Sequence, residues 1–149
     1  MSNIKFLIMV FFINRCTAQG LVEDKCESIV KEFYIEHSKA WTKLPQPNPK
    51  ELYFVLDSIQ QKFCTNKLRK EAKEWFDEGH DLITNDWGVD DESISTIEVL
   101  KDSTTENRYV VSYIVKSYPV SPTKPVSKRV VLYVEVLLID DLCKINSVK

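Results

Sequence analysis

Apolar residues between Leu21 and Trp41 recur at spacings of three and four, while charged residues occupy the other side. This spacing is typical of an amphipathic helix that buries one face. We therefore predict a first helix over residues 21–41. Its core face is formed by Val22, Cys26, Ile29, Val30, Phe33, Tyr34, His37, Ala40 and Trp41.

Two further helices are predicted from their ends as well as from their periodicity. Asn48-Pro49 has the form of an N-cap and first helical residue, because proline lacks only an amide that the first turn leaves unpaired. Thr65 is a second N-cap, and Gly79 is suited to end a helix over 66–77. The expected buried positions are Leu52, Val55, Leu56, Ile59 and Phe63, followed by Leu68, Ala72, Trp75 and Phe76.

After residue 92 the period of the apolar positions changes from about 3.6 to 2, which indicates strands. Four strands are predicted, at 93–100, 108–116, 128–138 and 142–148. The connections at 102–107 and 140–141 are short, so neighbouring strands should pair as an antiparallel meander. The fold class is therefore α+β, with two to three N-terminal helices on one face of a four-stranded sheet.

The first residues resemble a signal peptide. Lys5 precedes the apolar run Phe6–Ile13, which as a helix spans about 12 Å, too little for a hydrocarbon core of about 30 Å. Small residues in Cys16-Thr17-Ala18 then favour cleavage before Gln19. We expect a signal peptide at 1–18 and a single domain at 19–149. The alternative is lipidation of Cys16, although Asn14-Arg15 is a poor context for it.

Composition limits the function classes. The chain has 149 residues, 44% hydrophobic and 28% charged, which suits one folded domain. Without residues 1–18, which hold two bases and no acid, 18 basic residues face 22 acidic ones, for a net charge of −4. A chain without basic excess does not suit nucleic acid as its main partner. A periplasmic or secreted location is expected, or a lipid anchor through Cys16.

Three cysteines remain after cleavage, so at most one bond can form within the chain. In an oxidising compartment two of them should pair. If the first two helices are antiparallel, a rise of about 1.5 Å per residue brings Cys64 level with Cys26. We expect a Cys26–Cys64 disulfide and a buried thiol at Cys143. A Cys64–Cys143 bond, or no bond, are the alternatives.

Several short motifs resemble the bacterial domain-of-unknown-function 3828 family. They are Val30-Lys31-Glu32-Phe33-Tyr34, the run from Leu56 to Thr65, Asp81-Leu82-Ile83 and Tyr109-Val110-Val111-Ser112-Tyr113. The resemblance covers residues 22–148. It implies a small, exported or lipid-anchored protein with a cystatin-like or nuclear-transport-factor-like (NTF2-like) α+β fold. The family has no established catalytic residues to carry over, so function stays open.

The residues with chemical potential mostly favour structural roles. His37 lies on the core face of the first helix, where a hydrogen-bonded structural histidine is expected. His80 lies beside Asp81 and near Asp86, an arrangement for a base or metal ligand, but a favourable charge at a helix end explains it as well. The acids at 81–92 do not match a calcium-loop spacing. Cys64 is expected in a disulfide rather than as a nucleophile, so we predict no catalytic residue, metal or cofactor.

Two loops are the expected partner-binding surfaces. The first, at 81–92, contains Asp81, Asp86 and Trp87, and the second contains Pro119 and Pro122 in a stiff proline-rich segment. The leading hypothesis is an exported, non-catalytic binding or inhibitor protein, such as an immunity protein against a toxin or envelope hydrolase, as a monomer or weak dimer.

The alternative hypothesis is a cone-shaped small-molecule-binding or enzymatic domain. It requires a pocket between helices and sheet in which Tyr34, Tyr113 or Tyr133 lies beside a buried carboxylate.

Overall fold

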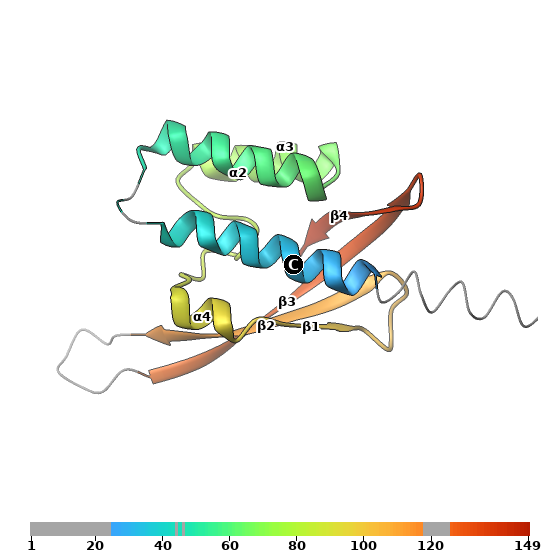
Figure 1. Ribbon diagram of the computed structural model, residues 1–149. Coiled ribbons are helices and arrows are strands. Elements are labelled where there is room, and N and C mark those ends of the chain that lie inside the picture. Colours follow the sequence, from blue (N-terminus) through green and yellow to red (C-terminus); the bar gives the residue numbers. More distant parts are fainter. Residues whose placement is uncertain (1–24, 44, 46, 118–125) are drawn as a thin grey trace, which may run out of the picture.

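A four-stranded antiparallel sheet carries the helices on one face (Figure 1). The structure is a computed structural model that describes residues 25–43, 45, 47–117 and 126–149. The sheet order is β1-β2-β3-β4, so strands that follow each other in sequence are neighbours. The α+β class and the meander topology are confirmed. The strands are β1 (Glu98–Lys101), β2 (Arg108–Ser117), β3 (Val126–Ile139) and β4 (Leu142–Val148).

The N-terminal helix (residues 25–42) runs across the sheet, as the blue ribbon in Figure 1 shows. Helices α2 (Pro49–Phe63) and α3 (Asn66–Asp77) lie beside it, and the amide of Thr65 between them donates to Ile145 O of β4 at 2.8 Å. No helix in the described part of the chain is long and apolar enough to cross a membrane. The predicted signal peptide and the loop with Pro119 and Pro122 lie outside the described residues.

Both predicted helix starts are confirmed by their caps. The side chain of Asn48 accepts from the amide of Glu51 at 2.9 Å, and that of Thr65 accepts from Leu68 at 3.3 Å. Each contact satisfies an amide that the first helical turn leaves without a partner. One expected core position is wrong: Val55 of α2 is 44% exposed.

The core lies between the N-terminal helix and the inner face of the sheet. The helix contributes side chains spaced by three and four residues, and each strand contributes alternate residues. Fully buried members of this cluster include Val30, Phe33, Tyr34, Val111, Val134 and Ile145.

The first half of the predicted first strand is helical instead. Residues Asp91–Ser95 form a short helix, α4, and β1 begins only at Glu98. The carboxylate of Asp90 accepts hydrogen bonds from both the amide and the hydroxyl of Ser93, each at 2.7 Å. This N-cap stabilises a helical turn where the alternating pattern alone indicated a strand.

The predicted disulfide is also wrong. Cys26 is bonded to Cys143 of β4, with 5.4 Å between the Cα atoms, and Cys64 is a buried free thiol. The rise along two helices fixes how far along the axis two residues lie, but it does not fix the direction of their side chains. Cys26 shares a helix face with Val30 and Phe33, and this face lies on the sheet, so its sulfur points to β4.

Candidate functional site

The loop that connects α3 to α4 begins with a sharp change of direction at Gly79. This residue has φ +87°, a conformation that costs glycine little. The amide of Gly79 donates to Phe76 O at 3.0 Å, and that of His80 donates to Trp75 O at 2.9 Å. This Schellman pattern ends α3 and turns the chain toward the N-terminal helix.

Asp81 attaches this loop to the N-terminal helix. Its carboxylate accepts from the amide of Ile83 at 3.1 Å and from the hydroxyl of Thr84 at 2.7 Å. Nε2 of His37, a fully buried residue, lies 3.1 and 3.0 Å from the two carboxylate oxygens. Two segments 44 residues apart in sequence are thus joined by a polar contact beneath the surface.

The electrostatics of Asp81 favour an ionised carboxylate. Burial by itself would raise the pKa of Asp81, but the charge and hydrogen bond of His37 and the hydrogen bonds from Thr84 and Ile83 outweigh burial and lower the pKa. Nε2 of His37 also lies 3.2 Å from Nε1 of Trp41. One ring nitrogen cannot donate to Asp81 and accept from Trp41 at once, and the ionised carboxylate favours donation to Asp81.

Asp86 closes the loop from its other end. One oxygen accepts from the amide of Asp81 at 2.7 Å, and the other lies 2.8 Å from Nδ1 of His80. Asn85 and Asp86 have φ of 51° and 59°, the left-handed conformation that Asn and Asp tolerate better than other side-chain-bearing residues. The predicted residues Asp81 and Asp86 are therefore brought together, in a loop whose shape they maintain.

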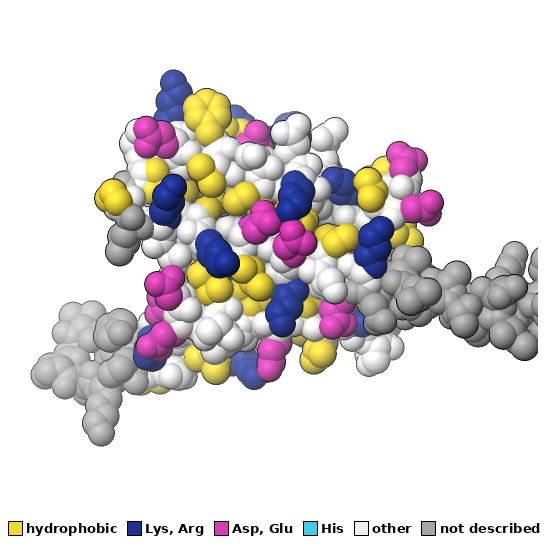
Figure 2. Space-filling model, in the orientation of Figure 1, with side chains coloured by type: hydrophobic (Ala, Val, Ile, Leu, Met, Phe, Trp, Pro, Cys, Tyr) yellow, Lys and Arg dark blue, Asp and Glu magenta, His cyan; other side chains and the backbone are white. Residues whose placement is uncertain are grey.

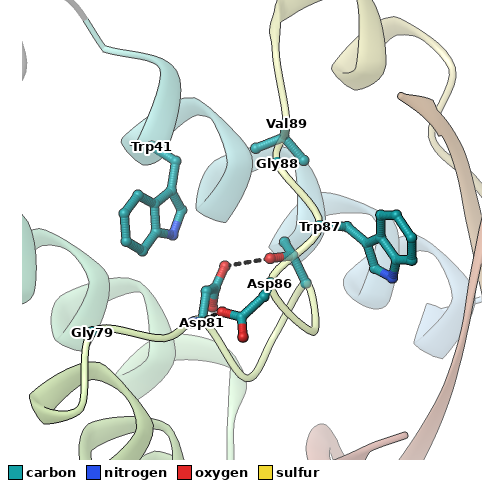
Figure 3. Close-up of a pocket in the computed structure, with 8 residues that line it drawn as sticks. Trp41, Gly79, Asp81, Asp86, Trp87, Gly88 and Val89 are labelled. Atoms are coloured by element: carbon teal, nitrogen blue, oxygen red, sulfur yellow. Dashed lines mark hydrogen bonds between the residues drawn. The ribbon is translucent and has the colours of Figure 1, made fainter. Parts of the chain in front are cut away.

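The third predicted residue of this loop, Trp87, is half-buried against the main core. The ammonium of Lys128 on β3 lies 3.7 Å from the centroid of its ring, a cation–π contact. Trp87 therefore anchors the loop to the sheet, and Figure 3 shows its indole directed away from Trp41.

A pocket of about 260 Å³ lies between the end of the N-terminal helix and this loop; we call it the Asp81 pocket. The two charged residues of its lining, Asp81 and Asp86, are both acidic. The side chain of Asp81 is 14% exposed, so the pocket reaches a carboxylate that is otherwise enclosed. The lining consists of Trp41, Gly79, Asp81, Thr84, Asp86, Trp87, Gly88 and Val89.

Two tyrosines lie in the core behind Asp81. The hydroxyl of Tyr34 donates to Ile83 O at 3.2 Å, whereas the buried hydroxyl of Tyr113 has no partner among the described residues. Burial raises the pKa of both tyrosines, and the charge of Asp81 contributes to each shift. Both phenols are therefore neutral at physiological pH. Tyr133, in contrast, is 43% exposed, with the Arg108 guanidinium carbon 5.1 Å from its ring centroid.

Two of the groups that could carry out catalysis, the Cys64 thiol and the His37 ring, are enclosed, whereas the side chain of His80 is 54% exposed beside Asp86. Burial raises the pKa of the Cys64 thiol to about 12, so almost no thiolate forms at neutral pH. His37 is fully buried, and Nδ1 of its ring has no partner among the described residues. Within the part of the chain that the structure describes, no three His, Cys, Asp or Glu side chains are placed to hold a metal ion. The lining of the Asp81 pocket therefore includes two carboxylates, and neither Cys64 nor His37 is part of it.

Charges on the visible surface are mixed in sign. Acidic and basic side chains are interspersed on the face in Figure 2. Lys62 on α2, for example, lies 2.8 Å from Glu32 and 3.1 Å from Glu36 of the N-terminal helix. In the lining of the Asp81 pocket, by contrast, both charged residues are acidic.

Sequence reasoning identified the loop but not its contact with the helix. The signal was present: a histidine on a buried helix face needs a polar partner, and Asp81 is one of several acids in the loop. Because the loop contains several acids, the sequence pattern did not indicate which of them would be the partner of His37. Trp41 was expected only as a core residue, whereas it is half-buried and lines the pocket.

Comparison with known proteins supports the fold. The chain resembles a crystal structure of a protein of unknown function from Bacteroides thetaiotaomicron VPI-5482, with a TM-score of 0.70 and 20% sequence identity. The match covers 93% of this chain and 98% of that chain. No family model matches the chain, and no curated protein matches it. At this identity the likeness establishes the α+β architecture alone.

Proposed function

We propose that this chain is an exported, non-catalytic binding protein of the bacterial cell envelope. The observation that carries the proposal is the Asp81 pocket, where a solvent-accessible carboxylate lies in a tightly hydrogen-bonded loop. Preorganised loops of this kind lose little entropy on binding. The buried Cys64 and His37, in contrast, offer no reactive group to a substrate.

Export is supported by the disulfide between Cys26 and Cys143, because such bonds persist in oxidising compartments. The signal-like segment at 1–18 agrees with this location, and cleavage before Gln19 remains our interpretation. Membership of the domain-of-unknown-function 3828 family is part of the same proposal.

In its narrower form, the proposal is that of an inhibitor or immunity protein. A toxin or envelope hydrolase would dock on the loop at 81–92, whose backbone is fixed by Asp81, Asp86 and Asp90. An inhibitor needs a rigid surface loop and no catalytic residue.

Affinity capture from envelope extract tests whether the chain is an inhibitor or immunity protein. The wild-type protein is compared with a variant in which an added side chain blocks the Asp81 pocket. A Cβ on Gly88 would meet nothing within 4 Å, so Gly88→Gln should project into open space without disturbing the fold. Ser58→Gln adds the same side chain on the exposed side of α2 and serves as control. We expect a partner retained by wild type and Ser58→Gln and lost by Gly88→Gln. Equal capture by all three proteins would contradict a site at this loop.

A small-molecule-binding function is the second candidate, favoured by a specific observation. Tyr34 donates to the carbonyl of Ile83, whose amide donates to Asp81, so a tyrosine hydroxyl and a largely buried carboxylate that lines the pocket meet at one residue. The tyrosines themselves lie behind the pocket and do not line it. A ligand would therefore contact Asp81, and the tyrosines would act only through it.

A further inference from the structure

A second hollow adjoins the Asp81 pocket on the far side of Trp41. It also measures about 260 Å³, and we call it the proline pocket. The described side chains that line it are aliphatic or aromatic, and it shares Trp41 and Gly79 with the Asp81 pocket. The remaining lining residues are Pro47, Pro49, Leu52 and Phe76.

Trp41 forms the boundary between the two hollows. Figure 3 shows its indole across the Asp81 pocket from the loop at 86–89, with the ring nitrogen toward Asp81. On the other side, its ring centroid lies 6.3 Å from that of Phe76, a wall of the proline pocket. An occupant of both hollows would therefore lie against the indole.

The two hollows differ in charge. The charged residues that line the Asp81 pocket are acids, whereas none of the described residues that line the proline pocket is charged. Asp86 is exposed enough to accept further hydrogen bonds, since each of its oxygens has one assigned donor. Such a position favours a positively charged group, whereas the two carboxylates would repel an anion.

The size of the combined site fits a small molecule. Ligand pockets commonly measure about 300 to 1,000 Å³, and two adjoining hollows of about 260 Å³ each reach this range together. They provide one polar and one apolar subsite, separated by an aromatic ring.

We propose that the two pockets bind an organic cation with an apolar body. Its ammonium group lies at Asp81 and Asp86, and its aromatic or branched aliphatic part fills the proline pocket. The ring of Trp41 contacts the ligand between them. The inference rests on the small-molecule form of the proposed function.

The test uses three matched probes on the ¹⁵N-labelled mature protein: 2-phenylethylamine, 2-phenylethanol and phenylacetate. We expect the amine to shift the Trp41 side-chain N–H resonance and the amides of residues 79–89 in a saturable manner. The alcohol should bind about tenfold more weakly or worse, because it lacks the charge that the carboxylates favour. Phenylacetate should give no saturable shift.

Two variants separate the subsites. Asp86→Asn should weaken the amine several-fold and leave the alcohol unchanged, while Asp91→Asn, an exposed acid outside both pockets, should change neither. Pro47→Ala should weaken the amine and the alcohol by similar factors. Dispersion of the amide spectrum verifies that each variant is folded.

Either of two results would overturn the inference: no saturable shift with the amine, or equal binding of the alcohol and the amine. If capture from envelope extract remains sensitive to Gly88→Gln in that case, only the ligand chemistry is wrong. If capture is insensitive as well, the binding function at this site is wrong too.

Discussion

Removal of the disulfide should destabilise the protein far more than removal of the third cysteine. The bond between Cys26 and Cys143 spans 117 residues, nearly the whole described chain. In the chain-entropy model, a closed loop of this length stabilises the native state by about 5 kcal/mol. Cys64 forms no bond, so Cys64→Ala should cost only its packing, on the order of 1 kcal/mol.

The variants must be chosen so that Cys64 cannot form a new disulfide with a remaining cysteine. Cys64 forms a β-bridge with Ile145, two residues after Cys143 on β4, so removing one bonded cysteine leaves two thiols in the same part of the core. The appropriate variant therefore combines Cys26→Ala with Cys143→Ala, and urea titrations of this variant, of Cys64→Ala and of wild type are compared. The double variant should lose about 5 kcal/mol plus the packing of two buried residues, a loss that approaches the total stability of many domains.

Non-reducing peptide mapping gives an independent answer. A linked peptide pair with Cys26 and Cys143 is expected, together with an unmodified Cys64 peptide. A linked peptide that contains Cys64, or a Cys64→Ala variant as unstable as the double variant, would refute the reasoning.

Three further predictions concern the core and the site. Phe33→Ala should cost about 3–5 kcal/mol in a denaturant titration, because Phe33 is fully buried; a loss below about 1 kcal/mol would contradict its place in the core. Asp81→Asn should cost about 1.5–3 kcal/mol at neutral pH through loss of charge-assisted hydrogen bonds. Since the folded pKa of Asp81 is lowered, this stabilisation is present above the unfolded pKa of about 3.9 and is lost as pH falls through the folded pKa. Urea titrations at pH 7 and pH 3 should therefore show a smaller difference between wild type and variant at pH 3, and an equal or larger difference would argue against the ionised carboxylate. Cys64 should resist iodoacetamide in the native protein at pH 8, because burial raises its thiol pKa to about 12; rapid alkylation followed by mass spectrometry would show an accessible thiol instead.

The elements that depend on local chemistry were predictable. Asn48, Thr65 and Gly79 determine where α2 and α3 begin and end, and each acts on amides or carbonyls within a few residues. Strands β2 and β3 were predictable from the alternation of apolar and polar residues, because one face of the sheet is buried and side chains along a strand point to the two faces in turn. Helix α4 was not predicted because two local signals compete there. The cap contact between Asp90 and Ser93 favours a helical turn, whereas the weak alternating pattern favours a strand.

Contacts between distant segments were not predictable from the same signals. The Cys26–Cys143 bond depends on which face of the N-terminal helix lies on the sheet, and helix rise contains no information about that direction. The contact of His37 with Asp81 requires the loop after α3 to return under the helix, which the turn at Gly79 permits but does not specify. The Asp81 pocket borders this second contact, so the loop could be expected to contribute to a site, whereas the part played by Trp41 at the end of the helix could not.

Hydrogen exchange tests most directly whether this chain binds its partner or ligand through the loop after α3 and the adjoining end of the N-terminal helix. Exchange of the protein alone is compared with that of its complex with the species captured from envelope extract. We expect new protection at residues 79–89 and around Trp41, with little change on the outer face of the sheet. Protection centred instead on exposed apolar residues of that face, such as Val131 and Tyr133, would contradict it.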